Sequence, residues 1–152
     1  NQIRNNTAEI SFNPEVEVNE SLFIPKSYIS SAERRLFYYK RISLIESEDD
    51  SVSLVDELLD KFGPIPYELL NLIHIADIKI QMRRLGASKL QIKAKSLIIK
   101  AVKLDEMKDI DMELPREEKG LYETVQFIKK TRSLEDLVGD DYQFKSGRIL
   151  IK

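Results

Sequence analysis

The sequence has no cysteine and no tryptophan, and it has one histidine in 152 residues. Without cysteine, the chain has no disulfides, thiolate zinc sites, iron–sulfur clusters or cysteine nucleophiles. The single histidine, His74, excludes metal sites built from several histidines. It lies three residues before Asp77 inside a predicted helix, but one unsupported histidine is a weak catalytic signal. We therefore assign His74 a structural role.

Glycine is scarce as well, with five glycines that are isolated from one another and lie near predicted element ends. No glycine-rich phosphate loop is present, and the motifs GxGxxG, GxxxxGK[ST], HExxH and GxSxG are absent. These absences exclude an ATPase or kinase site in this segment. We expect the segment to be non-catalytic, with no metal and no cofactor of its own.

The chain also lacks an excess of either charge, because it has 24 basic and 26 acidic residues and a formal net charge of −2. This balance argues against general binding of polyanions. No run of apolar residues is long enough to span a membrane, and no signal peptide is visible, so we expect a cytoplasmic protein without membrane contact. The polar, asparagine-rich start, without Met, predicts a linker at 1–14 and a domain at 15–152.

The hydrophobic content of 42% is ordinary for a globular domain, and its periodicity predicts an α+β fold. Three helices come first, and a small antiparallel sheet with further short helices follows. The predicted helices are Ser30 or Ser31 to about Ser47, Ser51 or Ser53 to Phe62, and Tyr67–Leu85. The first has two apolar groups, one with Tyr38 and Ile42 and one with Leu36, Phe37 and Leu44, so we expect it to be covered on more than one side.

The rest of the chain has shorter elements. An extended segment at Glu9–Val18 is interrupted by Pro14, and the alternation after Gly86 predicts a hairpin. The remaining predictions are a hairpin of Lys89–Ala94 and Leu97–Leu104, one or two helical turns in Asp105–Met112, a loop at Leu114–Gly120, helices at Leu121–Lys130 and Ser133–Val138, and a second hairpin at Tyr142–Ile151.

The second helix carries the most specific surface pattern. Its apolar residues Val55, Leu58, Leu59 and Phe62 are spaced to face a core, which places Glu57 and Asp60 on the opposite side. Gly63 and Pro64 end the helix, because Gly63 suits a left-handed cap position and Pro64 cannot continue it; Pro66 opens the next helix and Gly86 closes it. Glu57 and Asp60 thus form a small acidic patch, for which spacing alone favours a solvated face, with contact to arginines of a partner as the alternative.

Two other surfaces bear on function. Four acidic clusters occur, but their places in caps and on exposed helix faces favour solvation over metal binding. They are Glu46/Glu48/Asp49/Asp50, Asp56/Glu57/Asp60, Asp105/Glu106/Asp109/Asp111/Glu113 and Asp140/Asp141. The Lys89–Lys103 hairpin is basic and offers an alternative function as a DNA-binding appendage. It lacks the interleaved aromatic residues that stack on bases, so solubilising lysines are the better interpretation.

Five motifs occur in order at family spacing: FIPKSYI at Phe23–Ile29, RRLFYYKRI at Arg34–Ile42, ELLDKFGPIP at Glu57–Pro66, NLI at Asn71–Ile73 and RRLG at Arg83–Gly86. Together they closely resemble the C-terminal (TRCF) domain of the bacterial transcription-repair coupling factors, the Mfd family. The resemblance is strong from about Phe23 to Leu90. The region after Leu104 diverges, and no family contact is transferred to it.

The resemblance implies a regulatory role. In that family the full protein is an ATP-dependent DNA translocase that displaces stalled RNA polymerase and recruits the excision-repair protein UvrA. Its motor, with ATP and magnesium, lies upstream of this domain, so the resemblance identifies 1–14 as the linker from the motor region. The C-terminal domain docks on an N-terminal UvrB-like module and masks the UvrA-binding surface. The family's contact acids fall on Glu57 and Asp60.

Overall fold

A computed structural model describes residues 13–103, 108–115, 120–134, 142–145 and 148–151. Within these residues the chain forms four helices and six strands, which confirms the predicted α+β class. The helices are α1 Ala32–Ser43, α2 Glu48–Phe62, α3 Tyr67–Leu85 and α4 Leu121–Lys129. The strands are β1 Glu15–Val18, β2 Ala87–Ile92, β3 Ser96–Lys103, β4 Lys108–Pro115, β5 Tyr142–Lys145 and β6 Arg148–Ile151.

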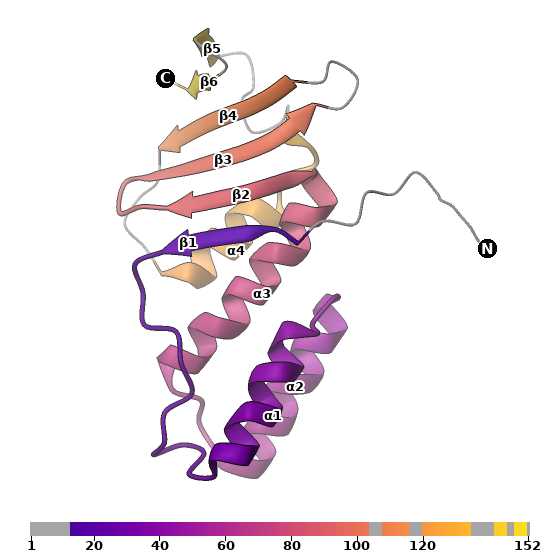
Figure 1. The fold of residues 1–152 in the computed structure, drawn as a ribbon, viewed down its shortest axis with the longest axis vertical. Coiled ribbons are helices and arrows are strands. Elements are labelled where there is room, and N and C mark those ends of the chain that lie inside the picture. Colours follow the sequence, from indigo (N-terminus) through magenta and orange to yellow (C-terminus); the bar gives the residue numbers. More distant parts are fainter. Residues whose placement is uncertain (1–12, 104–107, 116–119, 135–141, 146–147, 152) are drawn as a thin grey trace, which may run out of the picture.

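The elements form two halves joined by α3 (Figure 1). We call the sheet with α4 the sheet half, and α1, α2 and the loop before them the helical half. Helix α3 contacts α1 and α2 on one side and α4, β1 and β2 on the other. Its two apolar stripes explain this position, because Leu69 and Ile73 pack into the core of the helical half while Ile78 and Met82 pack into that of the sheet half. The third helix is therefore the central helix of the described structure.

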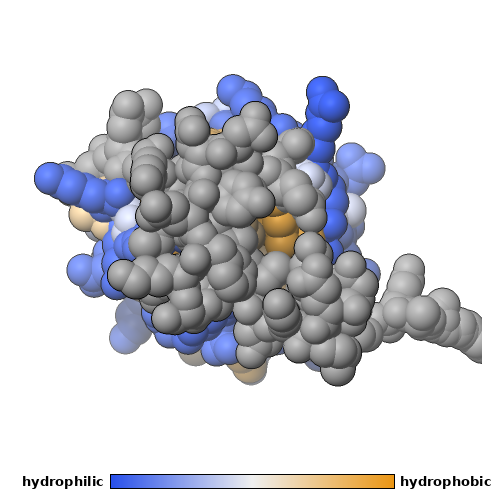
Figure 2. Space-filling view, turned by 90° about the horizontal axis from the view of Figure 1, so that it is seen from above, coloured by the Kyte–Doolittle hydropathy of each residue, from blue (hydrophilic) through white to orange (hydrophobic). Residues whose placement is uncertain are grey.

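The sheet is mixed, in the order β1-β2-β3-β4-β6-β5. Both predicted hairpins are confirmed, because β2 pairs antiparallel with β3 and β5 pairs antiparallel with β6. The purely antiparallel arrangement is wrong, since β1 runs parallel to β2 and β4 runs parallel to β6. Strand β1 follows Pro14, whose missing N–H ends the pairing there. In an end-on view of the sheet half, the described surface is mainly hydrophilic, with a small hydrophobic area near the middle (Figure 2).

The largest difference from the prediction is β4, which occupies the described part, residues 108–112, of the segment expected to form helical turns at Asp105–Met112. Strand β3 pairs along its whole length with β4, from Ser96↔Pro115 to Lys103↔Lys108. Met112 and Leu114, two residues apart, are both buried in the sheet core. Pairing along the edge of β3 therefore overrides local helix propensity. Leu114 and Pro115 of the loop predicted at Leu114–Gly120 belong to β4. Residues 116–119 of that loop, and most of the predicted helix at Ser133–Val138, lie outside the described residues.

Helix α2 begins at Glu48, earlier than the predicted start at Ser51 or Ser53. The Ser47 hydroxyl accepts a hydrogen bond from the Asp50 backbone N–H at 3.2 Å, and three acidic residues occupy the first turn. Both features stabilise a helix N-terminus. Ser51 is instead buried within the helix and its hydroxyl donates to the Asp77 carboxylate of α3.

The Phe-Gly-Pro turn after α2 has a defined geometry. Gly63 has φ 84° and ψ −159°. Its φ is positive, as expected, but this backbone conformation lies outside the left-handed helical region and is adopted essentially by glycine alone. The Tyr28 hydroxyl lies 3.1 Å from the Leu58 carbonyl oxygen and 2.8 Å from that of Gly63. The Tyr28 ring packs on Phe62 at 5.5 Å between centroids. The turn is thereby fixed to the loop before α1.

The third helix matches its predicted bounds at both ends. Pro66 occupies the N-cap of α3 with φ −65°, a value that its ring imposes. Gly86 adopts the left-handed conformation at the C-cap, with φ 76° and ψ 19°. Ala87 begins β2 directly after this residue. Gly86 is therefore the point at which the chain passes from helix to sheet.

Candidate docking interface

The two acidic residues predicted to contact a partner lie on α2, but in different environments. The Glu57 side chain faces α1 and is 27% exposed. Asp60 is exposed to solvent. Within the described residues no hydrogen bond or ion pair is recorded for the Asp60 side chain, so its carboxylate is available to a partner. Glu57 is thus engaged with a neighbouring helix, whereas Asp60 faces solvent.

Glu57 joins α2 to α1. The Tyr38 hydroxyl donates to Glu57 Oε2 at 2.6 Å, and Arg41 Nη1 donates to Glu57 Oε1 at 2.6 Å. Lys61, one turn later on α2, places its Nζ 3.6 Å from Oε2. The hydrogen bonds from Tyr38 and Arg41 lower the pKa of Glu57 to about 2. Glu57 is therefore ionised at physiological pH and holds the two helices together.

Tyr38 is the aromatic centre of this network. Burial, followed by the hydrogen bond to Glu57, raises the pKa of the Tyr38 hydroxyl to about 12, so it remains a donor. Its ring lies edge-on to Phe62 at 5.7 Å and to Phe37 at 5.1 Å. The Arg41 guanidinium carbon lies 5.9 Å from the centroids of both the Phe37 and Tyr38 rings. These contacts fix the positions of the charged groups relative to one another.

The outer side of α1 is unexpectedly apolar. The sequence predicts cover for Leu36, Phe37 and Leu44, but these side chains are 70%, 55% and 61% exposed. The prediction that α1 is covered on more than one side is wrong for the described structure. Leu59 of α2, predicted to face the core, is 48% exposed, whereas Leu54 is buried in its place. Clustered apolar residues on a surface are typical of interaction sites.

We define the hairpin face as five exposed residues: Leu36 and Phe37 of α1, Leu44 at its C-cap, and Asp56 and Asp60 near the C-terminal end of α2. Sequence reasoning found its acidic part from helical spacing. It did not identify Tyr38 and Arg41 as the partners of Glu57. The RRLFYYKRI motif was the available signal, since it contains both residues.

The alternative surface, the basic β2–β3 hairpin, is partly neutralised. Lys89 Nζ lies 3.0 Å from Glu17 Oε1 of β1, and Gln91 Nε2 donates to Glu17 Oε2 at 2.8 Å. These contacts form because β1 pairs with the free edge of β2. Sequence patterns do not predict this pairing, which places the acidic side chain of Glu17 beside Lys89 of the predicted basic hairpin. This reduces the positive charge available to a polyanion.

The remaining candidate groups lie at the contact between α3 and its neighbours. His74 is partly buried, and this burial lowers its pKa; its ring lies 5.8 Å from that of Tyr122 on α4. Burial raises the pKa of Asp77, which accepts the hydrogen bond from Ser51. In the part of the chain that the structure describes, no three His, Cys, Asp or Glu side chains are arranged to hold a metal ion. Nor does any described helix have the length and apolar character needed to cross a bilayer.

Comparison with known proteins gives consistent results. The family model described as "TRCF domain" matches residues 18–113. A transcription-repair-coupling factor of Borreliella burgdorferi is 35% identical over 85 residues, which are 56% of this chain and 8% of that protein. One from Rickettsia conorii is 32% identical over 102 residues, 67% of this chain and 9% of that protein. The chain thus spans less than a tenth of either relative's length.

A solved structure is similar in fold. It is described as the crystal structure of the C-terminal domain of a transcription-repair coupling factor. The TM-score is 0.58 at 24% sequence identity, and the match covers 62% of this chain and 59% of that one.

Proposed function

The chain belongs to the TRCF domain family, and from that premise we propose that it is a non-catalytic regulatory domain that represses its parent protein. In this proposal the hairpin face docks on the N-terminal UvrB-like module of the same protein. Docking masks the surface that binds UvrA, so UvrA is a competitor for the module rather than a ligand of this domain.

The observation that carries the proposal is the composition of the hairpin face. Leu36, Phe37 and Leu44 expose apolar surface at α1 and its C-cap, and α2, which contacts α1, exposes Asp56 and Asp60. Apolar side chains bordered by charges are typical of a protein-binding surface, and an exposed carboxylate suits bidentate contact with arginine. The Glu57 network supports docking because it fixes the geometry of α1 and α2 before a partner arrives.

The chemistry of this face suits reversible docking. Its charged contacts lie at the surface, where individual ion pairs contribute little and are screened by salt. A domain tethered to its partner experiences a high effective concentration, so weak contacts suffice to populate the closed state. A change of a few kcal/mol then shifts the balance between closed and open states.

The wider activity belongs to the parent protein in this proposal. We propose that the parent is a cytoplasmic, ATP-dependent DNA translocase that displaces stalled RNA polymerase and recruits excision repair. ATP and magnesium would bind in an upstream motor. RNA polymerase and DNA would be contacted through other domains, and no membrane is involved.

The test uses the full-length parent with Asp60→Lys. This variant is preferred to Glu57→Lys, which would also remove the contacts with Tyr38 and Arg41. We expect UvrA to bind the variant about tenfold more tightly than wild type, a typical size for coupling between two sites, and basal ATPase activity to rise. Glu15→Lys makes the same charge change on β1 and serves as the matched control. If Asp60→Lys changes neither UvrA affinity nor ATPase activity, the proposal is wrong.

A further inference from the structure

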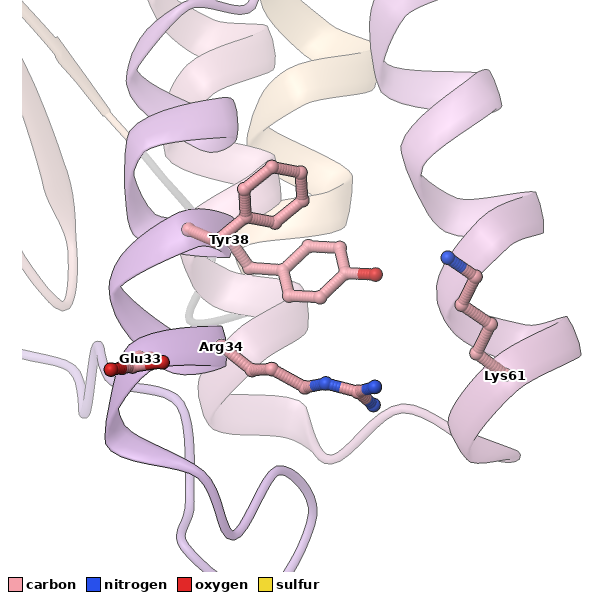
Figure 3. Close-up of a pocket in the computed structure, with 5 residues that line it drawn as sticks. Glu33, Arg34, Tyr38 and Lys61 are labelled. Carbon is pink, nitrogen blue, oxygen red and sulfur yellow. The ribbon is translucent and has the colours of Figure 1, made fainter.

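A groove of about 600 Å³ lies between α1 and α2, next to the Glu57 network. Arg34 and Tyr38 point into it from α1, and Lys61 points into it from α2 (Figure 3). Glu33 also lines the groove, but its side chain leaves α1 in a different direction from that of Arg34 in the same view. The charged groups that face one another across the groove are therefore both cations.

The acid beside the groove does not neutralise these cations. Glu57 already accepts the two short hydrogen bonds from Tyr38 and Arg41, and the Arg41 charge balances its own. Lys61 lies 3.6 Å from Glu57, beyond a strong charge-assisted hydrogen bond, and its side chain is 56% exposed. Among the described residues, no acidic side chain is recorded as a partner of Arg34. The groove thus keeps a net positive charge at its mouth.

Aromatic rings supply the rest of the lining. Phe37 and Tyr38 both border the groove, and Phe37 is 55% exposed. A planar guanidinium, an ammonium and an apolar ring suit a carboxylate on a short aliphatic stem, because the guanidinium binds both carboxylate oxygens and the ring contacts the stem. The Tyr38 hydroxyl is already committed to Glu57, so Arg34 and Lys61 are the groups that remain to bind the anion.

We propose that this groove receives an acidic side chain of the docking partner. The inference rests on the proposed function and refines it, because the contact becomes two-sided. Asp60 binds a basic group of the N-terminal module, while Arg34 and Lys61 bind a carboxylate of the same module. Alternating charges of this kind fix the register of two surfaces, which a patch of one sign does less well.

A single carboxylate fits this site better than a nucleic acid backbone. A strand that placed one phosphate in the groove would carry its other phosphates past neighbouring acidic groups of α2. Asp56 and Asp60 are both exposed on that helix. Like charges side by side are repulsive, and nucleic acid binding depends on neutralising several phosphates together.

The test is Arg34→Glu in the full-length parent, with Lys95→Glu in the β2–β3 turn as the matched control. The Arg34 side chain is exposed, so the substitution leaves the core intact. We expect UvrA affinity to rise roughly tenfold, as for Asp60→Lys, and to remain unchanged for the control. Each acid on the N-terminal module is then reversed to lysine, and one such reversal is expected to restore masking only when combined with Arg34→Glu.

The outcomes separate the inference from the function. If Asp60→Lys unmasks UvrA binding and Arg34→Glu does not, the carboxylate groove is refuted and the docking function stands. If neither variant has an effect, the docking function itself fails. Unmasking by Arg34→Glu without rescue by any acid reversal also refutes the carboxylate partner. A lower DNA affinity and shallower salt dependence for Arg34→Glu, with UvrA affinity unchanged, would identify the groove as a phosphate contact instead.

Discussion

The helical half and the sheet half share α3 but differ in how much apolar surface they expose. In the sheet half, α4 buries Leu121, Val125 and Ile128 with the sheet core, and Glu17 pairs with Lys89 at the edge. In the helical half, α1 buries Tyr38 and Ile42 on one side and exposes large apolar residues on the other. Among the described residues, the sheet half exposes two large apolar side chains, Tyr122 and Phe127 of α4, whereas the helical half exposes more and has a face suited to a partner.

This difference shows how a small domain separates stability from recognition. The fixed part of the helical half is Glu57 with Tyr38 and Arg41, which are held together by short hydrogen bonds. The adaptable part is Asp60, Arg34 and Lys61, whose side chains reach solvent. A rigid support beneath exposed contact groups reduces the entropy lost on docking.

The largest expected effect comes from the core of the helical half. Leu58 is fully buried, and Leu58→Ala should lower the free energy of unfolding by about 3 kcal/mol through the lost apolar contacts and the cavity left behind. Leu90→Ala in the sheet half should cost a similar amount, because Leu90 is also buried. Since α3 belongs to both cores, urea denaturation followed by circular dichroism should show one transition in each variant. Two separate transitions would mean that the halves unfold independently.

Replacing the glycines that end α2 and α3 by alanine should lower the free energy of unfolding by a smaller amount, and by different amounts at the two positions. Added Cβ atoms would meet open space at both positions, so the cost of Ala is backbone strain alone. Gly63→Ala should cost about 2 kcal/mol, because Gly63 has a backbone conformation that only glycine adopts readily. Gly86→Ala should cost about 1 kcal/mol, because a single left-handed residue is less strained. Thermal denaturation of both variants checks the order, and equal costs would contradict it.

The smallest effect concerns pH. The folded pKa of Glu57 is about 2, below the ordinary value of 4.5, so its contribution is complete above pH 4.5 and is lost as the pH falls toward 2. Glu57→Gln should lower stability by about 1 kcal/mol at pH 7, after allowance for partial solvent screening, and by almost nothing near pH 2. Glu17→Gln at the exposed sheet edge should change the pH dependence of stability less than Glu57→Gln does. Parallel urea titrations from pH 7 to pH 2 test it, and identical profiles for the wild type and Glu57→Gln would contradict it.

Local signals in the sequence predicted most of the helical part. Pro66 and Gly86 predicted both ends of α3, because each residue restricts or permits a particular backbone conformation at its own position. The start of α2 was placed too late, because Ser47, Ser51 and Ser53 are all capable caps. Burial of Ser51 against Asp77 depends on α3, which local propensity does not include.

Pairing between distant segments could not be predicted. Strand β1 lies parallel to β2 across more than 70 residues of sequence, as the Glu17 to Gln91 contact shows. Strand β4 was mistaken for helix because its pairing with β3 is tertiary information. The site shows the same limit, since spacing located Glu57 and Asp60 on α2 but did not reveal that Glu57 turns toward Arg41 of α1.

The most direct test of the docking claim is hydroxyl-radical footprinting of exposed side chains in the separate chain and in the full-length parent. We predict that Leu36, Phe37 and Leu44 are oxidised more slowly in the parent, because the N-terminal module covers them. Tyr122 and Phe127, which are exposed on α4, should react at the same rate in both. Asp60→Lys in the parent should restore the rates on α1. Equal rates on α1 in the chain and the parent, or protection confined to α4, would contradict the account.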